Sequence, residues 1–257
     1  MSAGDELSSC IEWQFAECGE LDARLRAASD AGFTSAEFHL WRDKPVDALA
    51  EALAETGMRL TSICVDPRKS IVDPNERSAM VAAVREMIAA ARKLGKPNLI
   101  VASGFRVEGL SEEADFANAV TALRAVADAA EEAGVTLLLE PLNTRLFASM
   151  YLVSTKIGLD LVEAVDSPNL RLLFDVWHSA VMGEDIVDVL DGRIHLVGHV
   201  QVADLEDRHE PGTGSLNWEY IMYALRRLGH SGAIGLDYIP SPPMEQSLAL
   251  SRQKICQ

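Results

Sequence analysis

The sequence predicts an α/β fold, an eight-stranded parallel (β/α)8 barrel formed as a single domain by residues 1–257. Three observations predict it. Apolar runs typical of buried strands alternate with helical patterns along the whole chain. The alternation yields eight strand–helix pairs, which in 257 residues is the size of a closed barrel. No GxGxxG phosphate turn follows the first predicted strand, which disfavours a doubly wound open sheet, the main alternative.

The predicted elements alternate strictly from the first strand to the last helix. Strands are predicted at residues 8–15, 35–40, 59–65, 98–103, 136–140, 170–176, 193–203 and 233–239. Helices are predicted at residues 21–31, 46–56, 73–94, 111–133, 154–165, 183–190, 217–228 and 247–255. Asp73 and Pro74 indicate the start of the third helix, as a cap and a first-turn proline. Parallel strands with right-handed crossovers bring all carboxyl ends of the strands to one mouth.

Composition narrows the class of protein. The formal net charge is −16, which disfavours nucleic acid as a partner. No stretch is long and apolar enough to cross a bilayer, so we expect no membrane partner. The cysteines are scattered without CxxC spacing, and the N-terminus carries no signal peptide. We therefore expect reduced thiols and a cytoplasmic protein. No Pro/Gly/Ser linker divides the chain, which favours a single domain.

Four consecutive apolar runs each end in a side chain that carries oxygen. These residues are Glu140, Asp175, Gln201 and Asp237. A charge at the end of a buried strand is costly unless a partner or a metal offsets it. Because the ligand set is all oxygen, a hard divalent cation such as Mn²⁺ or Mg²⁺ suits it better than structural zinc. The alternative interpretation is that each acid caps its strand and pairs with a nearby arginine.

Polar residues that follow the sixth and seventh strands are candidates for substrate contact. His178 comes three residues after Asp175, on the loop above the sheet, within reach of a ligand. Its alternative role is that of a hydrogen-bonded loop histidine. Arg208 precedes a tight Pro-Gly-Thr-Gly turn that can direct it toward a substrate oxygen. For His209 and Glu210 we expect exposure to solvent.

The end of the second strand and three tryptophans add further candidates. Glu37 and His39 both face the same mouth, and we expect one of them to point inward, although the spacing leaves open which. Tryptophans near strand ends either form the wall of a small pocket or pack in the core. They are Trp13, Trp41 and Trp177.

At these positions the chain resembles a known family. The motifs are Leu-Glu-Pro-Leu-Asn-Thr-Arg (139–145), Leu-Leu-Phe-Asp-Val-Trp-His (172–178), Val-Met-Gly-Glu-Asp (181–185), His-Val-Gln-Val-Ala-Asp (199–204) and Arg-His-Glu-Pro-Gly-Thr-Gly (208–214). Together they resemble hydroxypyruvate isomerases of the xylose isomerase-like TIM barrel superfamily, which also includes tagatose/psicose epimerases and endonuclease IV. The resemblance covers nearly the whole chain and is densest over residues 137–240.

The resemblance implies a reaction and a role for each site residue. It implies isomerisation between aldose and ketose of a small sugar-like or hydroxy-keto acid substrate, with a divalent metal that stabilises an enediolate and no organic cofactor. The family's metal ligands fall on Glu140, Asp175, Gln201 and Asp237, and its proton-transfer carboxylates on Glu140 and Asp237. Its substrate contacts fall on His178 and Arg208. Barrels of this family often pair, which implies a homodimer or homotetramer.

Three positions depart from the family pattern. Asp237 stands where the family has Glu, and it is shorter by one methylene group. Residues 146–150 replace the usual Asp-His-Pro-Gly and its following aromatic residue. Ala180 stands where the family often has Gln. The first departure concerns the chemistry, and the other two concern the fit of the substrate.

Alternative functions remain open from the sequence. A ketose 3-epimerase or an inosose-type dehydratase uses the same parts on another substrate. A non-catalytic barrel that binds a metal or a sugar belongs to a different class, and the departure at Asp237 is compatible with it. A phosphodiesterase like endonuclease IV is disfavoured, because the resemblance would then imply a His-rich zinc site and a surface for DNA. This chain has six histidines and a strong negative charge.

Overall fold

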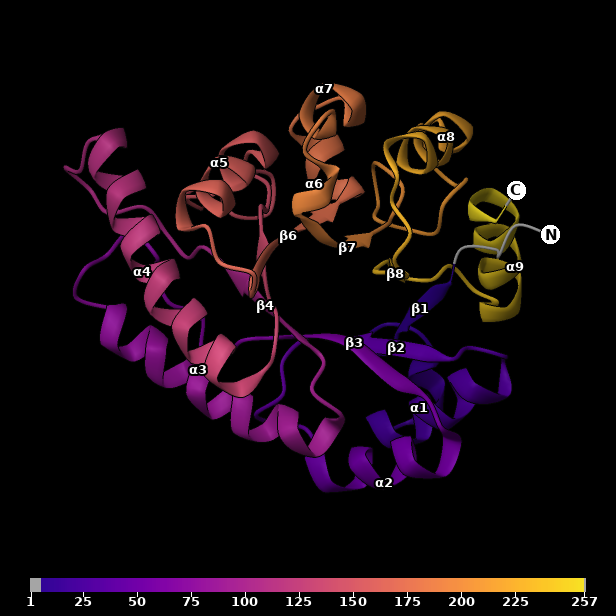
Figure 1. The fold of residues 1–257 in the computed structure, drawn as a ribbon. Helices are drawn as coiled ribbons and strands as arrows, with labels where there is room; N and C mark the ends of the chain where they lie inside the picture. The colour runs from indigo at the N-terminus through magenta and orange to yellow at the C-terminus, as the bar shows by residue number, and fades with distance from the viewer. Residues whose placement is uncertain (1–5, 257) are drawn as a thin grey trace.

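Eight parallel strands close into one barrel in the order of the sequence, which confirms the predicted fold class. This computed structural model describes residues 6–256. The strands are β1 (Leu7–Cys10), β2 (Ser35–Phe38), β3 (Arg59–Cys64), β4 (Asn98–Ala102), β5 (Leu137–Glu140), β6 (Leu170–Asp175), β7 (Val197–Gln201) and β8 (Ile234–Leu236). Figure 1 shows them at the centre of the molecule, with helices on the outside.

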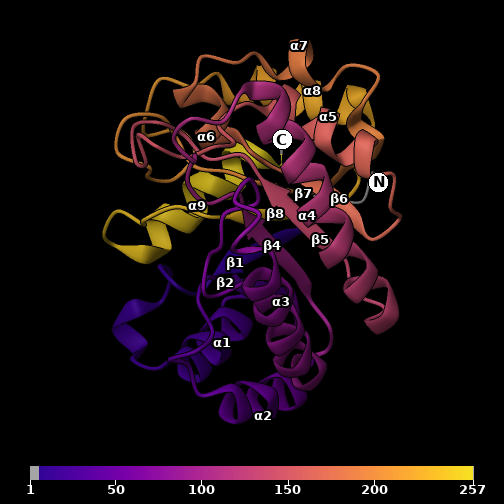
Figure 2. The ribbon, with the colours of Figure 1, turned by 90° about the vertical axis from the view of Figure 1, so that its left-hand side faces the viewer.

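Helices connect each strand to the next around the barrel. They are α1 (Leu21–Asp30), α2 (Val46–Thr56), α3 (Arg77–Ala91), α4 (Glu112–Ala133), α5 (Thr155–Val165), α6 (Val176–Val181), α7 (Ile186–Leu190), α8 (Trp218–Leu228) and α9 (Met244–Ile255), with short 3-10 turns η1 (Ala16–Cys18), η2 (Arg92–Leu94) and η3 (Ile194–Leu196). Neighbouring helices pack side by side, as α3 and α4 do in Figure 2.

Several predicted boundaries were wrong by a few residues. The third predicted helix begins at Arg77, because Asp73 accepts a hydrogen bond from the Asn75 backbone and forms a turn in place of a cap. The first strand ends at Cys10, not at residue 15, and a turn follows. The sequence pattern also missed α6, which begins directly after β6 with Asp175 as its cap. Helix α6 is important for the site, since it carries His178.

Alternate residues of each strand pack on opposite sides of the barrel wall. Leu99 and Val101 of β4 belong to the main core between strands and helices. Ile100, between them, belongs to a second small cluster with Leu138 and Leu173. This alternation is the ordinary period of a strand, so the second cluster lies inside the barrel. The closed wall therefore fixes the positions of the strand ends that surround the mouth.

The other half of the barrel interior is polar and is organised by Glu37 of β2. The carboxylate accepts hydrogen bonds from Thr61 at 2.9 Å and from the amide of Gln201 at 2.8 Å. It also lies 2.8 Å from His199 Nε2. The adjacent Gly235 makes room for it, because a β-carbon there would lie 2.4 Å from Glu37 Oε1. This network holds Gln201 by its amide nitrogen at the base of the mouth.

The cysteines and the helices bear on two expectations drawn from composition. Cys10, Cys18 and Cys64 form no disulfide bond within residues 6–256. In residues 6–256, none of the helices has both the length and the apolar character that crossing a bilayer requires.

Candidate functional site

A cavity of about 390 Å³ opens at the carboxyl ends of the strands. This volume lies within the range of roughly 300–1,000 Å³ that small-molecule sites occupy. Five of the six predicted site residues line it, namely Glu140, His178, Gln201, Arg208 and Asp237. The sixth, Asp175, is buried beside them at the end of β6. The fold therefore brings all the predicted residues to one mouth, although it divides them into two groups.

The first group consists of Glu140, Asp175 and His178. His178 Nε2 lies 3.9 Å from Glu140 Oε1 and 3.8 Å from Asp175 Oδ2. Asp175 Oδ1 caps α6 and accepts hydrogen bonds from the backbone N–H groups of Trp177 and His178. Its Oδ2 is buried and has no hydrogen-bond partner among residues 6–256. Since buried polar atoms are almost always satisfied, this oxygen is a free position for a cation or a substrate donor.

Burial changes the protonation of this group. The pKa of Glu140 is raised to about 8, first by burial and then by the charges of Asp175 and Asp237. Burial also raises the pKa of Asp175 to about 7, against the opposing charge of Arg208. The pKa of His178 is lowered to about 3, by burial and then by Arg208. Without a bound cation, Glu140 therefore carries a proton at neutral pH and His178 is neutral.

These shifts predict how the stability of the metal-free protein depends on pH. The folded-state pKa of Glu140, about 8, lies above the ordinary value of 4.5, so between these values the folded state binds a proton that the unfolded state lacks. The contribution of Glu140 to stability is therefore lost as pH rises from 4.5 to 8. In urea unfolding with EDTA, we expect Glu140→Gln to lose less stability than the wild type between pH 5 and 8. Equal losses in the two proteins would contradict the raised pKa.

The hydrogen bonds of Asn143 determine which nitrogen of His178 carries its proton. Asn143 Oδ1 accepts a hydrogen bond from the backbone N–H of Leu146, which orients the amide. Asn143 Nδ2 then donates to His178 Nδ1 at 2.9 Å. Because the imidazole is neutral, its proton lies on Nε2, which faces Glu140 and Asp175. His178 is therefore prepared to donate a hydrogen bond to a substrate oxygen and is poorly suited to bind a metal through Nε2.

Arg208 lies between the two groups. Its Nη2 donates to Asp237 Oδ2 at 2.5 Å and lies 3.7 Å from Asp175 Oδ2. The guanidinium stacks over Trp177, with 4.6 Å from Cζ to the ring centroid. Arg208 thus acts as a counter-charge for two predicted metal ligands. For Asp237, this is the arginine pairing that the alternative interpretation of the sequence describes.

The second group forms around Asp237, which the sequence placed in a single set with Glu140. Asp237 Oδ1 lies 2.9 Å from His39 Nε2 and accepts hydrogen bonds from Trp13 at 3.1 Å and from Cys10 at 3.3 Å. Burial raises the pKa of Asp237, but the charges of Arg208 and His39 outweigh burial and hold it well below its usual range. Asp237 is therefore ionised, and donors saturate both of its oxygens.

The structure also answers the remaining questions about individual side chains. Glu37 is buried inside the barrel, whereas His39 lines the cavity, so both point toward the mouth at different depths. Of the three tryptophans, only Trp13 lines the cavity.

The expectation for Glu210 was wrong: it is buried and accepts hydrogen bonds from the backbone and hydroxyl of Ser241. His209 is partly exposed and lies against the carbonyl oxygen of Ile239.

Sequence analysis missed Arg68, on the loop after β3. Arg68 lines the cavity, and its Cζ lies 5.0 Å from the centroid of Phe147. Among residues 6–256 it has no ion pair, whereas Arg208 is occupied by carboxylates. Phe147 belongs to the segment that departs from the family pattern, and this departure was the available signal. Arg68 is thus a positive charge at the cavity that no carboxylate of the described chain neutralises.

Comparisons with known proteins agree with the barrel fold. The family model for the xylose isomerase-like TIM barrel matches residues 25–254. A putative hydroxypyruvate isomerase of Streptomyces coelicolor is 34% identical over 88% of each chain. A 2-oxo-tetronate isomerase of Pectobacterium atrosepticum is 29% identical over 88% of each chain. A crystal structure titled AP endonuclease, family 2, from Brucella melitensis has a TM-score of 0.88 and 28% identity, and the alignment covers 95% of this chain and 97% of that one.

Proposed function

Because the chain belongs to the xylose isomerase-like TIM barrel family, we propose that it interconverts the ketone and aldehyde forms of a small hydroxy-keto acid with the help of a divalent cation. The chain is an isomerase, as its named relatives are. The two relatives described above are named for hydroxypyruvate and 2-oxo-tetronate, which are both 2-keto acids with a neighbouring hydroxyl group. The net charge of −16 supports a small substrate rather than a nucleic acid.

The observation that carries the proposal is the state of Glu140. Its carboxyl group lines the cavity and accepts no hydrogen bond within residues 6–256, and the side chain is 10% exposed. Without a cation its pKa is raised to about 8, and a cation held beside it would favour the ionised form, which is the form that can accept a proton. Perturbed carboxyl groups of this kind are typical of catalytic sites.

The reaction on hydroxypyruvate then has a simple proton balance. Glu140 removes a proton from C3, and the electron pair forms an enediolate between C3 and C2. The same carboxyl group returns the proton to C2. The proton of the C3 hydroxyl passes to the oxygen on C2, so that C3 becomes the aldehyde and C2 carries the hydroxyl group. His178 donates its Nε2–H to the oxygen that becomes negative. Since Asp237 is saturated by donors, we assign it the role of holding Arg208, in place of the proton transfer that the resemblance implies.

One observation supports a divalent cation at these side chains: Asp175 Oδ2 is buried and accepts no hydrogen bond from residues 6–256. Glu140 and Asp175 would hold the ion with Gln201, whose amide nitrogen is bound by Glu37, so that its carbonyl oxygen remains available. Asp237, the fourth predicted ligand, would join only after its Oδ2 leaves Arg208. These are hard ligands of the kind that Mn²⁺ and Mg²⁺ prefer. When bound, such a cation polarises the carbonyl and lowers the pKa of the neighbouring C–H group.

An NMR assay tests this function directly. The full chain is treated with EDTA, supplied with Mn²⁺ or Mg²⁺, and incubated with hydroxypyruvate. We expect a new aldehyde proton signal with the metal and a much slower change with EDTA. D-fructose, a neutral ketose, serves as the comparison for the 3-epimerase alternative. Epimerisation of fructose without conversion of hydroxypyruvate would replace the proposed function with that alternative.

Arg68 gives a prediction about substrate choice. A guanidinium group without a carboxylate partner pairs well with the carboxylate of a keto acid, and Phe147 holds it at the cavity. Loss of one such charged hydrogen bond costs about 1.5–3 kcal/mol, so we expect Arg68→Gln to raise KM for hydroxypyruvate about 10–100-fold with a smaller change in kcat. Arg106→Gln is the matched control, because Arg106 stacks on Tyr151 but does not line the cavity. An equal rise in KM for the two variants would contradict a role for Arg68 in substrate binding.

A further inference from the structure

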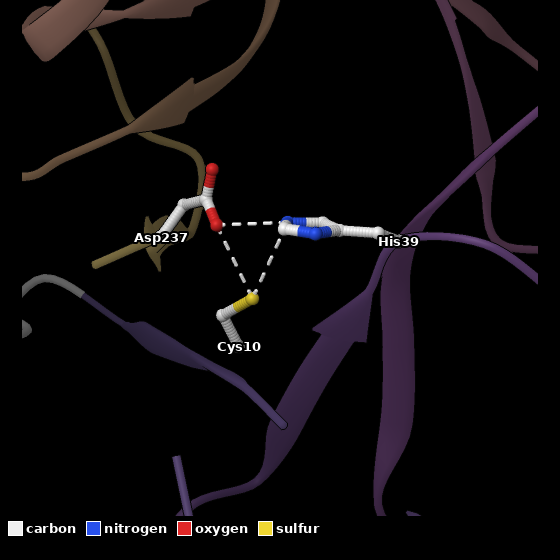
Figure 3. Close-up of side chains that lie close together, drawn as sticks. All are labelled: Cys10, His39 and Asp237. Atoms are coloured by element: carbon white, nitrogen blue, oxygen red, sulfur yellow. Dashed lines mark hydrogen bonds and ion pairs between the residues drawn. The ribbon is translucent and has the colours of Figure 1, made fainter. Parts of the chain in front are cut away.

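Three side chains from three different strand ends meet beside the cavity. Cys10 ends β1, His39 follows β2, and Asp237 follows β8, and Figure 3 shows their ends directed at one point. The distances are 2.9 Å from His39 Nε2 to Asp237 Oδ1, 3.3 Å from Cys10 Sγ to the same oxygen, and 3.7 Å from Sγ to Nε2. One sulfur, one nitrogen and one oxygen thus form a small triangle.

The triangle has the dimensions of one face of a tetrahedral metal site. At the usual Zn²⁺ bond lengths to sulfur, nitrogen and oxygen, ligand atoms lie about 3.3–3.6 Å apart around the ion. The three distances bracket this range, so small side-chain rotations bring each atom into place. We propose that Cys10, His39 and Asp237 bind a borderline divalent ion of the Zn²⁺ or Co²⁺ class, with the fourth position open to the cavity.

The surroundings are compatible with an ion at this point. His39 and Asp237 line the cavity, which supplies the entry path. Arg208 bonds to Asp237 Oδ2, and the proposed ligand atom is Oδ1, so that ion pair is retained. Trp13 keeps its hydrogen bond to Oδ1, since a carboxylate oxygen accepts more than one. On binding, the thiol proton of Cys10 and the Nε2 proton of His39 leave to solvent, and His39 ligates as the tautomer protonated on Nδ1. The thiolate then offsets one charge of the ion, and Arg208 and the ion share the carboxylate of Asp237.

This position differs from the one that Glu140 and Asp175 offer. Those residues and Gln201 supply only oxygen, which favours hard ions, whereas a thiolate and an imidazole favour borderline and soft ones. In the described chain, Cys10, His39 and Asp237 form one cluster of candidate ligand atoms, whereas Glu140 and Asp175 belong to another together with His178. The inference therefore stands without the proposed reaction, because it predicts a metal that is bound through sulfur whether or not hydroxypyruvate is turned over.

Cobalt absorption tests the inference without any assay of activity. The full chain, freed of metal with a chelator, is titrated with Co²⁺ while near-ultraviolet absorption is recorded. We expect a sulfur-to-cobalt charge-transfer band in the wild type, unchanged by excess Mg²⁺, and no band in Cys10→Ala or Cys10→Ser. For His39→Gln we expect the band to need at least about 10–100-fold more Co²⁺, since loss of a ligand exceeds the usual effect of an outer-shell partner.

Cys64→Ala is the matched control, because Cys64 also lines the cavity but is not part of the group. This variant should keep the band at the wild-type Co²⁺ concentration. Circular dichroism melting of each metal-free variant checks that it is folded, and Cys10→Ser retains a polar group of similar size if alanine disturbs packing. Absence of the band in the wild type, or its persistence in the Cys10 variants, would overturn the proposal.

Discussion

Replacing Glu140 with Gln should lower kcat for hydroxypyruvate by about 10²–10⁴-fold, the usual contribution of a positioned acid or base. The amide has nearly the same shape but accepts no proton, so the step at C3 loses its base. The fold should be retained, because Glu140 accepts no hydrogen bond within the described chain that the amide would lose. A neutral amide also avoids the cost of burying the charged carboxylate. Steady-state rates in saturating Mn²⁺ measure the effect, and urea unfolding measures the stability.

Glu184→Gln is the control for this substitution. Glu184 is a partly exposed carboxylate that accepts hydrogen bonds from Ser154, Thr155 and Ser179, and it does not line the cavity. Its replacement should alter kcat by less than about threefold, because Glu184 does not contact the reacting atoms. If Glu140→Gln retained activity near that of the control, Glu140 would not be the base.

Replacing Arg208 with Met should destabilise the metal-free protein by about 3–5 kcal/mol, the usual cost of removing one partner from a buried ion pair. The Arg208 side chain is 16% exposed and those of Asp175 and Asp237 are 1% and 3% exposed, so water screens the remaining charges poorly. Added Mn²⁺ should restore part of the loss, because a cation held by the same carboxylates replaces the missing charge. Urea unfolding with EDTA and with Mn²⁺ measures both effects.

Arg193→Met provides the comparison. Arg193 pairs with Asp160 and Glu163, whose side chains are 44% and 51% exposed, so we expect a cost below about 1 kcal/mol and no recovery with Mn²⁺. A similar, metal-independent cost for both arginines would show that Arg208 acts through packing on Trp177 and not as a counter-charge.

The barrel could be predicted from the sequence because its signals are local. An apolar run buried on both faces, such as residues 137–139, is a strand signal that needs no knowledge of distant residues. Glycine after a helix is equally local, and Gly134 and Gly229 do adopt the left-handed conformation that ends α4 and α8. The start of α3 was wrong because two local structures compete for Asp73, a helix cap and a turn, and the turn wins.

The convergence of the site at one mouth was also predictable, since topology alone brings the strand ends together. The division of its residues into two groups was not. Asp237 contacts Cys10 and His39, which lie more than 190 positions away in the sequence. Whether the Asp237 carboxylate faces a metal or Arg208 depends on side-chain angles that no motif encodes. Arg68 was missed for the same reason, because its importance arises from Phe147 on another loop.

Deuterium exchange tests the central claim, proton transfer by Glu140 on a hydroxy-keto acid, most directly. Hydroxypyruvate is incubated in D₂O with the Mn²⁺-loaded protein and followed by proton NMR. The account predicts that the C3 proton signal decays with the wild type and that Glu140→Gln leaves the signal unchanged. Deuterium appears at C2 of the aldehyde product to the extent that the proton on Glu140 exchanges with solvent before its return. A C3 signal that persists with the folded, metal-loaded wild type would contradict it.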